Sequence, residues 1–152
     1  MPDNSQTNPA AFNCEGGLVL NKSTFLMQPG EALELRNFEP GGSSWTSRDS
    51  GRTSAGKYAF ERFNFDGTDK IVVVDGVNAP TVFNSSLAAT DVSDSTVAGA
   101  KFVASFKDHM FYAGKSTTKQ EVVFSQPFDE DAFSSGSGAG SFKVDDTIVG
   151  LK

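Results

Sequence analysis

The sequence predicts an all-β protein of short antiparallel strands, arranged either as partial blades like those of a β-propeller or as a small sandwich or barrel. Three observations predict this class. Short apolar or alternating segments recur along the chain, and turn residues separate them at close intervals. The 15 glycines favour many turns over long helices. Fourteen phenylalanines, against one tryptophan and two tyrosines, indicate a core made of rings without polar groups.

Residues 1–40 are expected to form an N-terminal arm followed by short strands. The arm, residues 1–11, is polar and contains two prolines. Leu33 and Leu35 alternate with charged residues, which is the period of a half-buried strand. Pro29-Gly30 fits a type II turn before that strand, because proline fixes φ and glycine supplies a positive φ.

Residues 41–57 interrupt the strand pattern. They are rich in Gly and Ser, and Trp45 is their only large apolar residue before Tyr58. This composition predicts a flexible loop or linker that separates residues 1–40 from a β-rich domain over residues 58–152.

Strand signals are strongest after residue 57. Residues 70–74 form a run of β-branched side chains that is typical of a strand buried on both faces. The apolar phase shifts between Phe60 and Phe63, which indicates a β-bulge. Asp66-Gly67 fits a hairpin turn. Further strands are expected at residues 81–83, 101–106, 109–113 and 120–124, and around residues 142–144 and 148–151.

Three segments of this part are expected to be irregular. Residues 85–98 read as a long loop, with a short edge strand as the alternative. Residues 127–133 predict one helical turn, because a proline is followed by acidic residues between two phenylalanines. Residues 134–140 read as a Ser/Gly loop. Because such loops hold few apolar anchors, we expect them and the arm to become ordered only against a neighbouring subunit.

The predicted core is aromatic and β-branched. Five rings could form one cluster, which we expect to be core rather than a carbohydrate platform, since sugar platforms usually expose Trp and Tyr. These five are Phe60, Phe63, Phe65, Phe102 and Phe106. Val72, Val74 and Phe124 complete the expected core.

Charge restricts the partners. The net charge is −6 and the pI is about 4.7, which disfavours gripping DNA, since phosphate neutralisation requires clustered Lys and Arg. A lining along which DNA passes without specific binding remains compatible with this charge. No apolar run reaches the roughly 20 residues of a membrane span, so no membrane partner is expected.

No catalytic centre can be assembled from the sequence. Cys14 is the single cysteine, which rules out an internal disulfide, and it is expected to be a small structural thiol. His109 is the single histidine and is expected to be a packing or surface residue. The acidic groups at residues 129–131 and 145–146 lack the spacing of a calcium loop. We therefore expect no enzyme, no cofactor and no metal.

An internal echo spans about forty residues. Residues 71–83 and residues 110–124 each read as an apolar run, a glycine, a polar turn and an apolar strand that ends in phenylalanine. The offset is close to the period of a propeller blade.

Several short motifs, in order, resemble tail nozzle or tail tubular proteins of short-tailed bacteriophages. The motifs are GGL at 16–18, PGEA at 29–32, RNF at 36–38, VVDGVNAP at 73–80, HMFYAG at 109–114, VFSQPFDEDAF at 123–133 and IVGL at 148–151. They correspond to a "GGL … PGEA … N" opening, a "DGxNxP" hairpin and an "SxPxDxxxF" unit in that family. The resemblance covers nearly the whole chain except the arm and residues 41–57.

This resemblance implies a non-catalytic structural component of the phage tail in the virion. The implied assembly is a β-propeller-like ring around the channel through which the genome is ejected. Its partners would be copies of itself and neighbouring tail proteins. The resemblance also implies that the chain corresponds to an N-terminal fragment or a shortened form of such proteins. The alternative is a glycan-binding module that recognises the host cell.

Overall fold

The computed structural model describes residues 14–21, 24–29, 34–38, 46–53 and 57–152, and it describes side chains from Thr46 onward. The all-β prediction is confirmed. The strands are β1 (Cys14–Asn21), β2 (Thr24–Pro29), β3 (Glu34–Phe38), β4 (Thr46–Ser50), β5 (Ala59–Phe63), β6 (Lys70–Val74), β7 (Thr81–Phe83), β8 (Ala89–Asp91), β9 (Phe102–Phe106), β10 (His109–Ala113), β11 (Glu121–Phe124) and β12 (Gly140–Lys143). One 3₁₀ turn, η1, covers Ser135–Ser137.

Each group of four consecutive strands forms one antiparallel sheet. The first sheet has the order β1-β2-β3-β4, the second β5-β6-β7-β8 and the third β9-β10-β11-β12. Each strand therefore pairs with the next one along the chain, so short turns suffice to connect them. Four-stranded sheets of this kind, repeated along a chain, are the building blocks of β-propellers.

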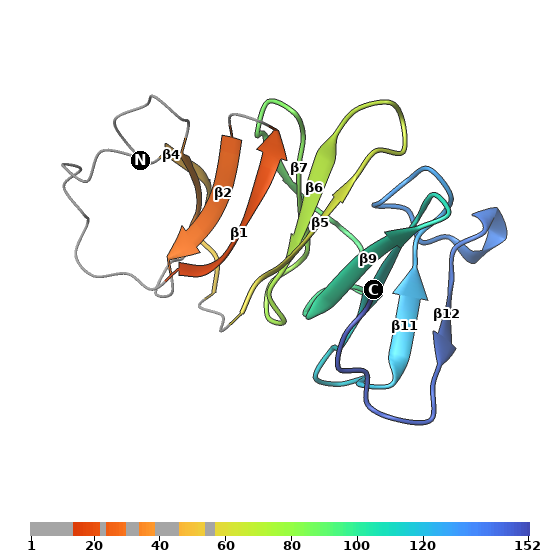
Figure 1. Cartoon of the computed structure of the whole chain (residues 1–152). Helices are drawn as coiled ribbons and strands as arrows, with labels where there is room; N and C mark the ends of the chain where they lie inside the picture. The colour runs from red at the N-terminus through yellow and green to blue at the C-terminus, as the bar shows by residue number, and fades with distance from the viewer. Residues whose placement is uncertain (1–13, 22–23, 30–33, 39–45, 54–56) are drawn as a thin grey trace.

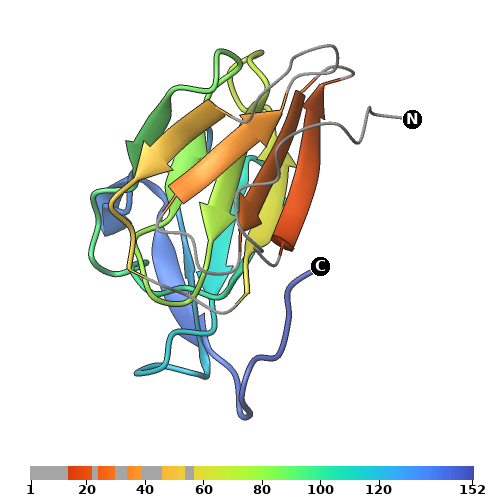
Figure 2. The same ribbon diagram turned by 90° about the vertical axis from the view of Figure 1, so that its left-hand side faces the viewer.

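The three sheets lie side by side in chain order (Figure 1). The first strand of the second sheet, β5, contacts β1 on one side and β9 on the other. Among the described residues, no comparably extensive contact joins the outer strands β4, β8 and β12. The sheets are therefore closest along their first strands, and the view along the stack shows them twisted relative to one another (Figure 2).

The second sheet is buried on both faces, as its β-branched run predicted. Val72, Val74 and Val82 face the third sheet and pack against Met110 and Tyr112. On the opposite face, toward the first sheet, Ile71, Val73 and Phe83 pack together with Tyr58 and Leu87. Alternate residues of one strand thus serve two cores.

The internal echo has a structural basis. Its two copies span β6 with β7 and β10 with β11, which are the second and third strands of consecutive sheets. The offset of about forty residues is therefore the length of one sheet with its connection.

The flexible-linker prediction for residues 41–57 is wrong where the structure describes them. Residues 46–50 form β4, which pairs with β3 from Glu34↔Ser50 to Asn37↔Thr46. An edge strand can be polar because backbone hydrogen bonds to one neighbour stabilise it without apolar burial. Residues 41–45, with Trp45, and residues 54–56 lie outside the described residues, as do the arm and the predicted Pro29-Gly30 turn beyond Pro29.

Three predictions about the phenylalanines are wrong. The pairing of β5 with β6 runs from Ala59↔Val74 to Phe63↔Lys70 without a shift, so no bulge lies between Phe60 and Phe63. Phe60 and Phe63 instead point to opposite faces and join different cores, which divides the expected five-ring cluster. Phe106 was expected in the core but is 62% exposed.

Two segments of the third sheet also differ from expectation. Residues 127–133 form turns rather than a helical turn; Phe128 has a φ of 63° and is exposed, whereas Phe133 packs against the Tyr112 ring at 5.8 Å. A positive φ cannot continue a right-handed helix. Residues 148–151 form no strand.

The segment 85–98 packs against the two cores of the chain. Leu87, Val92 and Val97 are buried, and residues 89–91 form the edge strand β8. The premise that this segment has too few apolar anchors to become ordered alone is therefore wrong. In the Ser/Gly segment 134–140, Ala139 is also buried.

Candidate functional site

The strongest side-chain constellation is a polar clamp between the first and second sheets. We define the Arg52 clamp as Arg52, Asp49, Asp75, Asn78 and Thr81. Arg52 follows β4, and its side chain is 4% exposed. Its Nη1 donates to Asp49 Oδ2 and to Thr81 Oγ1, both at 2.6 Å, and its Nη2 donates to Asp75 Oδ2 at 2.8 Å.

The turn after β6 is built around Asp75. Asp75 Oδ1 accepts hydrogen bonds from the backbone N–H groups of Val77 (2.9 Å) and Asn78 (2.8 Å). Gly76, between them, has a φ of 82°, a conformation that glycine adopts without a steric penalty. The carboxylate therefore organises its own turn while its second oxygen holds Arg52.

Asn78 extends the clamp to the backbone beside Arg52. Its Nδ2 donates to Asp75 Oδ2 (2.7 Å) and to the Thr53 carbonyl (2.8 Å), and its Oδ1 accepts from the Thr53 N–H (2.9 Å). Thr81 in turn donates its hydroxyl proton to Asp91 Oδ1 on β8 (2.7 Å). The "DGxNxP" motif thus supplies two of the side chains that connect β4 to the second sheet.

Electrostatics keep the clamp charged. Burial favours the neutral form of Asp75, but hydrogen bonds from Arg52, Asn78 and the backbone outweigh it and hold the pKa of Asp75 below its ordinary value. Burial likewise disfavours the Arg52 cation, but its bonds to Asp75 and Asp49 hold its pKa above the ordinary value. Removal of one partner would leave a buried charge without compensation. We therefore expect the junction between the first and second sheets to need both partners for its stability.

The junction between the second and third sheets uses different groups. It is mainly apolar, with Glu61 accepting hydrogen bonds from the Ser105 N–H and hydroxyl. At its outer end Lys70 pairs with Glu130 at 3.0 Å. Burial lowers the pKa of Lys70, but its contacts with Glu130 and Asp66 outweigh that effect and raise it.

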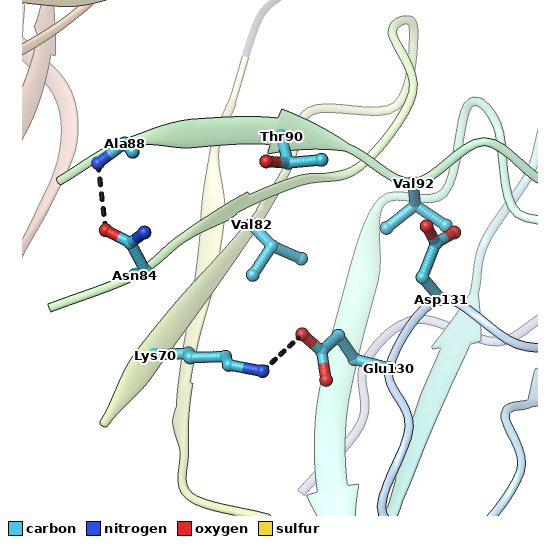
Figure 3. Close-up of a pocket in the computed structure, with 8 residues that line it drawn as sticks. All are labelled: Lys70, Val82, Asn84, Ala88, Thr90, Val92, Glu130 and Asp131. Atoms are coloured by element: carbon cyan, nitrogen blue, oxygen red, sulfur yellow. Dashed lines mark hydrogen bonds and ion pairs between the residues drawn. The ribbon is translucent and has the colours of Figure 1, made fainter. Parts of the chain in front are cut away.

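A cavity of about 250 Å³ lies beside that ion pair (Figure 3). Lys70 and Glu130 contact each other directly and line one part of it, and Val82 and Val92 form an apolar part of its wall. Two of its other polar side chains have protein partners: Asp131 accepts from the Ser93 N–H and Asn84 accepts from the Ala88 N–H. The arrangement is a seam between a sheet and a turn, and it presents no acid–base pair directed at a substrate.

The single histidine is a packing residue on the described structure. His109 Nδ1 lies 2.6 Å from the Ser125 carbonyl, and its ring contacts those of Phe111 and Phe124 at 6.2 and 5.7 Å. Cys14 begins β1, the edge strand of the first sheet, and its side chain lies outside the description.

Within the described residues, no three His, Cys, Asp or Glu side chains are placed to hold a metal ion. Of the acidic groups considered from the sequence, Glu130 pairs with Lys70 and Asp131 binds a backbone N–H, so both take part in the seam. No helix in the described part of the chain is long and apolar enough to cross a membrane.

Sequence reasoning missed Arg52 because its Ser/Gly-rich surroundings were interpreted as a linker. A signal was present, since an Asp three residues before the Arg offers a carboxylate partner directly ahead of the strongest strand region. No family model matches the chain, and no curated protein matches it with statistical significance.

Proposed function

We propose that this chain is a non-catalytic structural component of a bacteriophage tail, part of a ring that surrounds the DNA exit channel. The observation that carries the proposal is the succession of three four-stranded antiparallel sheets that adjoin along their first strands β1, β5 and β9. Sheets that are closest along one edge fan out around an axis, which is how propellers enclose a central channel.

The ordered motifs support the same proposal. The "DGxNxP" match falls on the turn whose Asp75 and Asn78 bind Arg52 and Thr53. A motif whose polar side chains hold two sheets together is expected of a structural protein, whereas a catalytic motif would direct its polar atoms into an open cleft.

The charge distribution fits a channel that DNA passes without being gripped. The chain carries a net charge of −6. Arg52 and Lys70 are engaged by carboxylates, and so is Arg62, which pairs with Asp69. Cations that are neutralised by the protein's own carboxylates contribute little to phosphate binding.

Immunogold electron microscopy tests the proposal. Antibodies raised against the chain should label the tail of virions encoded by the same genome, at the end distant from the capsid. Label confined to the capsid, or present only in lysate outside particles, would refute the tail assignment.

Host glycan binding is the alternative function. Sugar platforms are usually built from exposed aromatic rings. The one tryptophan of the chain, Trp45, lies outside the described residues, and the exposed rings of the described part are Phe106, Phe128 and Phe142. A glycan array decides between the two: specific sugar binding that is lost on Trp45→Ala or on substitution of an exposed phenylalanine would favour the alternative.

A further inference from the structure

We draw no further inference here: the strongest candidate, the row of rings formed by Phe111, Phe124 and Phe142 on the face of the third sheet opposite Met110 and Tyr112, is a partly exposed apolar face, and nothing in the structure shows what covers it.

Discussion

Replacing Asp75 with alanine should be among the most destabilising single changes in the described part of the chain. The Asp75 side chain is fully buried and accepts four hydrogen bonds. Two of them come from side chains, Arg52 and Asn78, and two from the backbone N–H groups of its own turn. Asp75→Ala removes all four and leaves the Arg52 guanidinium buried with one fewer carboxylate.

The magnitude follows from the burial of the pair. Removing one partner of a buried ion pair typically costs about 3–5 kcal/mol of unfolding free energy. Arg52 retains Asp49, so we expect the lower end, about 3 kcal/mol. Small domains are stable by only about 5–15 kcal/mol, so the loss should be evident as a large fall in the denaturation midpoint.

Urea denaturation followed by far-UV circular dichroism measures this loss. Asp69→Ala is the matched control, because Asp69 pairs with Arg62 while both side chains are exposed, at 42% and 49%. Exposed pairs contribute little, so the control should unfold close to wild type. Arg52→Met should cost less in the Asp75→Ala background than in wild type, because the two residues share one interaction.

The pH dependence gives a second readout of the same group. Because the folded pKa of Asp75 lies below its ordinary value of 3.8, its contribution is present above that value and is lost as the pH falls through the folded pKa. Wild type should therefore lose more stability than Asp75→Ala on acidification below about pH 4. Two results would show that the clamp is not a stabilising buried pair. One is that Asp75→Ala is no more destabilising than Asp69→Ala. The other is that Asp75→Ala loses as much unfolding free energy on acidification as wild type does.

Two further predictions concern the sheets. Gly114→Ala should be less stable than Gly67→Ala by about 1–3 kcal/mol: both glycines have a positive φ, but a Cβ at Gly114 would lie 2.6 Å from the Phe102 ring, whereas one at Gly67 meets nothing within 4 Å. Thermal denaturation of the two variants decides this, and equal midpoints would contradict it. In hydrogen exchange, the backbone amides of Lys70–Val74 should exchange more slowly than those of Gly140–Lys143, because β6 is internal and buried while β12 is an edge strand; equal rates would count against the described core.

The fold class and the most apolar strand could be predicted from the sequence because their signals are local. The run of residues 71–74 is continuous and β-branched, and its burial on both faces follows from that composition. The echo between residues 71–83 and 110–124 reflected equivalent strands, because each sheet repeats one sequence length. Local signals of this kind need no knowledge of which sheets are neighbours.

Predictions failed where contacts between distant parts of the chain determine whether a segment forms a strand or a side chain is buried. β4 is polar and stabilised by its pairing with β3, so its composition resembles that of a linker. Phe106 is exposed because no described element covers it, and the burial of Leu87 depends on a core toward the first sheet. Arg52 could be placed only once Asp75, 23 residues away, was seen beside it.

The two junctions between the described sheets are stabilised by different interactions. The first junction contains a buried cation held by carboxylates around Arg52. The second is made mainly of apolar side chains that include Val72, Met110 and Tyr112, with Glu61 bound to Ser105 and the Lys70–Glu130 pair at its outer end. Aliphatic side chains outnumber rings among the buried residues of this second junction. The second junction should therefore depend mainly on apolar burial and be weakly sensitive to salt, whereas the first depends on the charged groups around Arg52.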